Sequence, residues 1–264
     1  MNTKKTNECK VVALAIQKGG VAKTTSSVAM SAVLASEGYK VLLIDNDPQH
    51  NSTRALKRGA VNESIADVID DLINFKALSA NRGIVQTEEG FDLLPSSDAY
   101  AGTEVRLMSM SLSREYFIKK YVDMVRGDYD YIIIDCPPNL GMLTINALVA
   151  ADELLIPAQP QEYSATSIRQ VLNTVQMIRQ YSNSNLKVAG IFLTMFDGRR
   201  NEDNYMRNSI QQGFSAVRLY NTVIPYSVRV SEAARKHQSV VKYDGKGKVA
   251  EAYKNLVREV LQNG

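Results

Sequence analysis

Short, unbroken apolar runs recur along the chain, and they constrain its fold more than any other feature of the sequence. The runs cover residues 11–16, 41–44, 131–134, 154–156 and 188–193. Such runs are typical of strands buried on both faces, as in a parallel sheet. Residues 24–36 and 165–181 lie between them and have helical periodicity. This alternation predicts an α/β fold, a doubly wound and mostly parallel sheet with helices on both faces.

The rest of the chain shows no internal boundary. Its 264 residues, 45% of them apolar, suffice to build one large domain. No linker-like stretch or sharp change of composition divides the sequence. We therefore predict a flexible N-terminus over residues 1–10 and a single domain over residues 11–264. Within it, residues 60–89 are expected to hold one or two short helices, residues 91–94 a further strand, and residues 248–262 a helix that packs on the sheet.

Cysteine content and hydropathy indicate the compartment. Cys9 and Cys136 are the only two cysteines, too few for a disulfide scaffold. No apolar run reaches the roughly 18 residues of a membrane span, and the polar first ten residues do not resemble a secretory signal. These features favour a reduced, cytoplasmic setting.

The strongest chemical signal lies between the first apolar run and the first predicted helix. The segment reads Lys18, Gly19, Gly20, Val21, Ala22, Lys23, Thr24 and Thr25. Glycines permit a tight turn that points backbone N–H groups at one anion, and the following helix N-terminus adds further donors. Lys23 can reach the β- and γ-phosphates of a nucleotide, Thr24 can ligate Mg²⁺, and Thr25 can bind a phosphate oxygen. We therefore predict a phosphate-binding loop (P-loop).

This loop resembles the deviant Walker A box of the ParA/MinD superfamily of P-loop ATPases, whose hallmark is the additional lysine at the front, here Lys18. Further stretches match that superfamily in the same order. They are residues 41–49 with Asp45, residues 131–138 with Asp135, residues 151–157, residues 194–199 and residues 224–233. The resemblance covers residues 11–260, nearly the whole chain, and is most specific to ParA/Soj-like partition ATPases.

The resemblance implies a role for several residues. Lys18 would cross an ATP-sandwich homodimer and contact the phosphates bound by the partner. Asp45 would orient or activate the attacking water, and Asp135 would bind Mg²⁺ through water. Pro225 and Ser227 would line the adenine pocket.

The sequence departs from the superfamily pattern at several positions. Ala22 and His50 stand where relatives often have glycine. If residue 22 needs a positive φ, alanine there costs on the order of 1 kcal/mol, which bound phosphate would offset. Elsewhere, Thr166 and Ser167 replace an often-seen Glu-Gly, and the segment 225–227 replaces a usual Pro-Arg-Asn.

Positive charge is concentrated near the C-terminus. The net charge of the chain is +3, yet residues 199–248 hold ten Lys/Arg against four Asp/Glu. Such a segment suits a local anionic partner, although scattered surface cations are an alternative interpretation. Within it, we select Arg199, Arg207, Arg229 and Lys236 as candidate DNA contacts.

The resemblance implies a slow, Mg²⁺-dependent ATP hydrolase that dimerises on ATP. The dimer would bind DNA non-specifically and act in plasmid or chromosome partitioning, with a ParB-like centromere-binding protein as its partner. We expect it in the cytoplasm, on the nucleoid when ATP is bound, and away from membranes. One alternative is a MinD-like membrane-associated positioning ATPase, and another is a non-hydrolysing binding module in which Ala22 impairs the loop.

Overall fold

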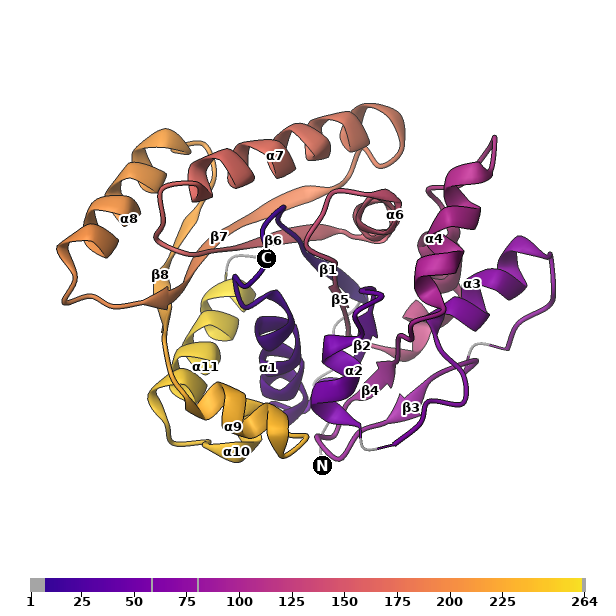
Figure 1. The fold of residues 1–264 in the computed structure, drawn as a ribbon, viewed down its shortest axis with the longest axis horizontal. Coiled ribbons are helices and arrows are strands. Elements are labelled where there is room, and N and C mark those ends of the chain that lie inside the picture. Colours follow the sequence, from indigo (N-terminus) through magenta and orange to yellow (C-terminus); the bar gives the residue numbers. More distant parts are fainter. Residues whose placement is uncertain (1–7, 58, 80, 263–264) are drawn as a thin grey trace.

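The fold is built on one central sheet, which a computed structural model describes for residues 8–57, 59–79 and 81–262 (Figure 1). Its eight strands run in the order β3-β4-β2-β5-β1-β6-β7-β8. They are β1 Lys10–Leu14, β2 Val41–Asp45, β3 Val85–Gln86, β4 Asp92–Leu94, β5 Tyr131–Asp135, β6 Glu153–Ala158, β7 Lys187–Phe196 and β8 Leu219–Pro225. All neighbours pair in parallel except β3 and β4.

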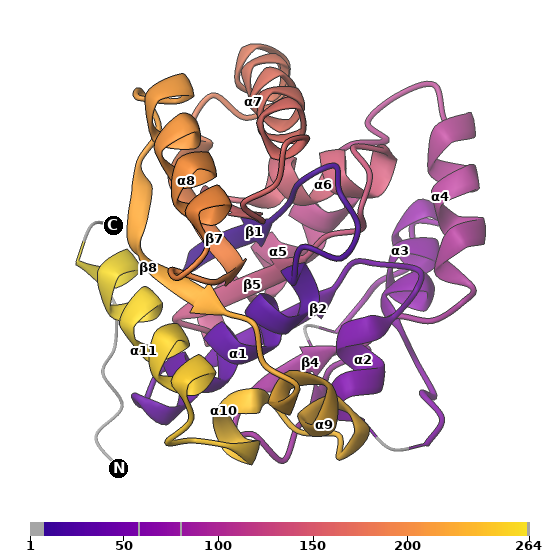
Figure 2. The ribbon, with the colours of Figure 1, turned by 60° about the vertical axis from the view of Figure 1, so that its left-hand side comes forward.

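Helices cover both faces of this sheet, as the apolar runs predicted (Figures 1 and 2). One face packs against α3 Ile65–Ile73, α4 Tyr100–Ser109, α5 Phe117–Val125, α6 Met142–Ala150, α7 Ser164–Tyr181 and α8 Asn201–Gly213. The other packs against α1 Lys23–Ser36, α2 Asn51–Leu56, α9 Arg229–Arg235, α10 Val240–Tyr243 and α11 Lys248–Leu261. Successive residues of β1 alternate between these two cores, as the period-two geometry of a strand requires. The predicted doubly wound fold is confirmed.

Most predicted elements are present, with small shifts of their ends. The first strand begins at Lys10, one residue before the expected domain start, and residues 1–7 of the predicted flexible N-terminus lie outside the described residues. The segment 60–89 contains α3 and the short strand β3. The last helix packs against α1 and β8, so its apolar stripe faces the core. Within the described residues, no helix has both the length and the apolar character needed to cross a membrane.

Candidate functional site

The P-loop connects the carboxyl end of β1 to the first turn of α1. Gly20 has φ of 72° and Ala22 has φ of 61°, so both occupy the left-handed region that favours glycine. Ala22 directly precedes α1, which begins at Lys23. The positive φ expected for Ala22 is therefore present. His50, the second departure, also has a positive φ, of 44°.

Two side chains from neighbouring strands fix the P-loop backbone. Gln159 Nε2 donates to Gly20 O at 2.8 Å. The hydroxyl of Thr194 donates to Val21 O at 3.1 Å. Gln159 directly follows β6 and Thr194 lies within β7, so the sheet itself positions the loop. Our sequence reasoning missed these residues, because each lies more than 100 positions from its partner.

Both lysines of the motif bind protein oxygens. Lys23 is buried, and its Nζ donates to Lys18 O at 2.8 Å. Lys18 Nζ donates to Gln161 Oε1 at 2.7 Å and to Ser164 Oγ at 3.4 Å, beyond the end of β6. Burial lowers the pKa of both ammonium groups. A phosphate ligand offers each lysine a stronger, charged acceptor than these neutral oxygens.

Asp45 and Asp135 end the adjacent strands β2 and β5, where the two residues are paired in register. Both are fully buried, with 0% exposure. Asp45 Oδ2 accepts hydrogen bonds from Thr53 N at 2.8 Å and Thr53 Oγ1 at 2.7 Å. Asp135 accepts from Ser27 Oγ at 3.1 Å and Ser52 Oγ at 2.7 Å. The structure thus brings both predicted carboxylates to the sheet edge where α/β proteins bind ligands.

Burial perturbs the acidity of this pair. Desolvation raises the pKa of Asp45, and the neighbouring carboxylate of Asp135 raises it further. Desolvation also raises the pKa of Asp135, against the opposing effects of Ser52, Thr24 and Lys23. Two buried carboxylates side by side repel each other unless a proton or a cation is shared. A divalent cation bound near these oxygens would therefore offset the repulsion between the two carboxylates.

A cavity of about 540 Å³ opens beside the P-loop. It is lined by residues 19–25 with Val28, and by Val230, Ala234, Arg235, Gln238, Ser239 and Val240. Asp47, Asn51, Arg54 and Ala55 also line it. Pro225 does not line this cavity but a separate hollow on the β8 side. Ser227 Oγ accepts a hydrogen bond from Arg229 N at 3.2 Å. The two predicted adenine contacts are therefore not brought to the P-loop cavity.

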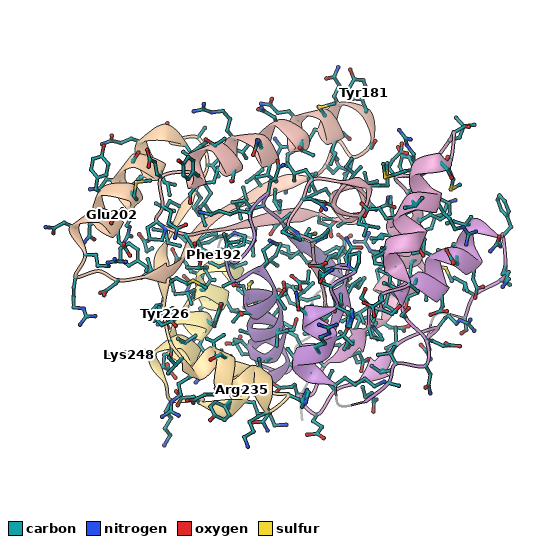
Figure 3. The ribbon with its side chains drawn as sticks, viewed as in Figure 1. Tyr181, Phe192, Glu202, Tyr226, Arg235 and Lys248 are labelled. Atoms are coloured by element: carbon teal, nitrogen blue, oxygen red, sulfur yellow. The ribbon has the colours of Figure 1, made fainter. Side chains whose placement is uncertain are left out.

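The four predicted DNA contacts lie in or near α8 and α9. Arg199 forms two hydrogen bonds of 2.9 Å with Asp197, and Arg229 pairs with Glu232 at 2.8 Å. Arg207 lies on α8 and Lys236 caps the end of α9. Arg199 also lines the hollow that contains Pro225, together with Lys246 and Lys248, which our sequence reasoning did not select. Figure 3 shows Tyr226 and Lys248 on the same side of the molecule, and both line this hollow.

The fold and the loop together define the class. A strand, a glycine-containing loop with a buried lysine, and a helix N-terminus at the carboxyl edge of a parallel sheet are the structural context of a P-loop nucleotide-binding protein. A protein family described as an AAA domain matches residues 9–188.

Comparison with known proteins then specifies the family. The chain is 40% identical over 258 residues to the sporulation initiation inhibitor protein Soj of Bacillus subtilis, covering 97% of this chain and 99% of Soj. It is 35% identical over 258 residues to the chromosome partitioning protein ParA of Myxococcus xanthus, covering 96% and 88%. A solved structure of cobyrinic acid a,c-diamide synthase from Mycobacterium smegmatis with bound ATP analog and magnesium superposes with a TM-score of 0.83, at 31% identity over 96% and 95% of the two chains. The chain belongs to the ParA/Soj family of P-loop ATPases.

Proposed function

We propose that the protein is a Mg²⁺-dependent ATPase that acts as a switch in DNA partitioning. The observation that carries this proposal is the P-loop with both lysines, placed beside the buried pair Asp45 and Asp135 in a chain 40% identical to Soj. A P-loop, a buried lysine and two carboxylates supply what phosphoryl transfer requires, which is mainly positioning and charge stabilisation.

Within this proposal each residue has a defined task. Backbone N–H groups of residues 19–25 bind the phosphates, Lys23 neutralises the β- and γ-phosphates, and Thr25 binds a phosphate oxygen. The Thr24 hydroxyl and the Asp135 carboxylate are oxygen donors, which Mg²⁺ prefers while retaining water ligands. The metal, when bound, neutralises charge on the phosphates. Asp45, held by Thr53, accepts a hydrogen bond from the attacking water and orients it.

Lys18 is the residue that links ATP to dimerisation. Its side chain is half-buried, and it donates to two uncharged side chains, Gln161 before α7 and Ser164 at the first residue of α7. In the proposed ATP-sandwich homodimer, Lys18 of each subunit exchanges these partners for a phosphate of the nucleotide in the other subunit. ATP then favours the dimer, and loss of the γ-phosphate on hydrolysis removes that contact.

The proposed DNA surface lies near α8, α9 and the start of α11. It comprises Arg199, Arg207, Arg229 and Lys236, with Lys246 and Lys248 added from the hollow beside Arg199. Arg199 and Arg229 bind neighbouring carboxylates, so each must exchange an ion pair for a phosphate. Exposed ion pairs contribute only about 0–1 kcal/mol, which makes this exchange cheap. DNA binding without base contacts follows, with strong salt dependence.

A centromere-binding partner of the ParB kind would stimulate hydrolysis and release the DNA, and the protein would reside in the cytoplasm, on the nucleoid when ATP-bound. The relatives named chromosome partitioning protein ParA support this role. The membrane alternative is less well supported, because the apolar stripe of α11 is buried in the core.

The test is binding of a non-specific DNA duplex, measured by fluorescence anisotropy with ATP, with ADP and without nucleotide, across a salt series. We expect binding only with ATP, steep weakening with salt, and loss of binding in Lys23→Ala. Lys18→Ala should still bind ATP but fail to dimerise in light scattering. A folded protein that binds ATP but never DNA would refute the partition function. Sedimentation with anionic liposomes would then test the membrane alternative.

A further inference from the structure

The cavity beside the P-loop carries more positive charge than the P-loop motif provides. Arg54 of α2 and Arg235 of α9 line it together with Lys23, whereas Asp47 is the one acid among the residues that line it. The nearby carboxylates are engaged elsewhere, since Asp98 lies 3.2 Å from His50 and Glu232 binds Arg229. Among the residues that the structure describes, neither Arg54 nor Arg235 forms an ion pair, and both line the cavity. Figure 3 shows Arg235 at the α9–α10 edge of the molecule.

Arg54 is held in place by a neighbouring ring. Its Nε donates to Nδ1 of His50 at 3.2 Å, and its terminal nitrogen lies 3.1 Å from Nε2 of the same ring. His50 Nε2 in turn lies 3.2 Å from Asp98 Oδ1. The ring of His50 therefore contacts both the guanidinium of Arg54 and the carboxylate of Asp98. This arrangement fixes the guanidinium before any ligand arrives.

A second contact holds the two arginine-bearing helices together. The ring of His237, directly after α9, donates from Nδ1 to Arg54 O at 2.8 Å. Figure 2 shows α2 beside α9, and the two helices are in contact. His237 has φ of 57°, a conformation that non-glycine residues rarely adopt. This hydrogen bond joins α2 and α9 beside the cavity, and each helix carries one of the two arginines.

We propose that Arg54 and Arg235, which line the same cavity as Lys23, bind the polyphosphate of the nucleotide, and that His50 positions Arg54 for this task. The proposal rests on the proposed function, because it assigns these residues to the ATP that the P-loop binds. A nucleoside triphosphate carries several negative charges, and the planar fork of arginine matches phosphate oxygens through paired hydrogen bonds. Three cations facing one acid suit that ligand, and they do not suit a neutral one.

Arg54 and Arg235 add positive charge to the cavity beyond that of the P-loop. Asn51 and Ala55 flank Arg54 along the cavity and carry no charge, so Arg54 is the cation that α2 contributes. In this proposal the P-loop binds the phosphates through backbone N–H groups and Lys23, and the two arginines add further cations from α2 and α9. The contribution of the arginines to affinity should therefore grow with the number of phosphates that the ligand carries.

The experiment measures the Kd of the full-length protein for ATP, ADP and AMP with Mg²⁺ by isothermal titration calorimetry. Arg54→Gln and Arg235→Gln are compared with Arg169→Gln, a control in an exposed arginine of α7. Each cavity variant should weaken ATP binding about tenfold, because a hydrogen bond to a charged group contributes roughly one factor of ten in affinity or more. AMP binding should change less than threefold, and the control should leave all three constants unchanged. Arg54 and Arg235 are exposed, so thermal unfolding should be unaltered.

His50→Asn tests the positioning role, because asparagine tolerates a positive φ but cannot hold the guanidinium as the ring does. We expect a smaller loss of ATP affinity than in Arg54→Gln, and little further loss when the two changes are combined.

Three outcomes would overturn the proposal. The first is an equal loss for AMP and ATP, which indicates a general structural effect. The second is no change beyond twofold in either arginine variant, while Lys23→Ala abolishes ATP binding. The third is unaltered nucleotide affinity with weakened DNA binding, which assigns the arginines to the DNA surface. Failure of the unmodified protein to bind any nucleotide would instead refute the proposed function itself.

Discussion

At the scale of single residues, two non-glycine residues adopt a backbone shape that favours glycine, Ala22 in the P-loop and His50 before α2. Ala22 and His50 have positive φ, although the resemblance to relatives suggests glycine at both positions. An L side chain in the left-handed region costs roughly 1–2 kcal/mol. Ala22 directly precedes α1, so this cost arises where the P-loop leads into the helix. The turn is therefore retained at the expense of stability.

The strain at residue 22 leads to a prediction about stability. Ala22→Gly should raise the free energy of unfolding by roughly 0.5–1 kcal/mol, because relief of the positive φ exceeds the entropic cost of glycine. Urea denaturation of the nucleotide-free protein measures the change. Ala35→Gly is the matched control within α1, and it should lower the free energy of unfolding by about 1 kcal/mol. A lower free energy of unfolding in both variants would show that residue 22 is unstrained.

The buried carboxylates lead to a prediction about pH. Burial and Asp135 raise the pKa of Asp45 above its unfolded value, so the unfolded chain releases this proton first as the pH rises. The stabilising contribution of Asp45 is complete below about pH 4 and is lost as the pH rises toward its raised pKa. Urea titrations without Mg²⁺ should show a weaker decline with pH in Asp45→Asn than in the unmodified chain. Asp128→Asn, at an exposed site, should retain the full decline, and equal slopes in all three would contradict the assignment.

At the scale of elements, the sequence predicted the strands that both cores bury and missed those at the edge. Strands β1, β2, β5 and β6 are continuous apolar runs with nearly every residue buried. Strand β8 ends the sheet, and its mixed burial gives neither a continuous run nor a clean alternation. The P-loop was predictable because its residues are consecutive. Its anchors Gln159 and Thr194, and the two arginines that line the P-loop cavity, depend on tertiary contacts that no local pattern encodes.

Pairing of β7 with its neighbours depends on one glycine. Gly190 has φ of 152°, and a Cβ there would lie 2.7 Å from Tyr220 Cε2 and 2.8 Å from Arg218 O. Gly190→Ala should therefore lower the free energy of unfolding by roughly 2 kcal/mol through overpacking and backbone strain. Gly102→Ala is the control in α4, where a Cβ meets no atom within 4 Å, and it should be stabilising by up to about 1 kcal/mol. Thermal or urea unfolding of both variants measures these changes. An unchanged free energy of unfolding in Gly190→Ala would show that β8 can shift to accommodate the added Cβ.

At the scale of the whole molecule, the basic segment 199–248 is far from the P-loop in the sequence but borders the P-loop cavity in the folded chain. The cations of residues 199–248 follow β7 and β8, and they reach both the P-loop cavity through Arg235 and the separate hollow through Arg199. One basic segment therefore borders both the P-loop cavity and the hollow that we propose as part of a DNA surface. The sequence revealed the excess of charge, whereas only the folded chain shows how it is divided.

That division predicts how salt affects the proposed DNA binding. Lys246→Gln and Lys248→Gln should each lower the slope of log affinity against log salt concentration by about 1, because each removes one phosphate contact. Affinity for ATP should be unchanged in both variants. Lys119→Gln, on α5, should leave the slope as it is. Anisotropy titrations at four salt concentrations give the slopes, and unaltered values would remove the hollow from the DNA surface.

The central position of β1 determines when this strand can pair during synthesis of the protein. Its partners are β5 and β6, so the strand that leads into the P-loop gains its first neighbour only after residue 131 has been made. At the elongation rates of ribosomes, roughly 6–25 s separate the two strands. Throughout that interval the apolar first strand lacks its place in the sheet, and high contact order makes its later pairing slow. A nascent chain released before β5 is made lacks the strand that pairs with both β1 and β2. It therefore cannot form the nucleotide site, although its P-loop motif is complete.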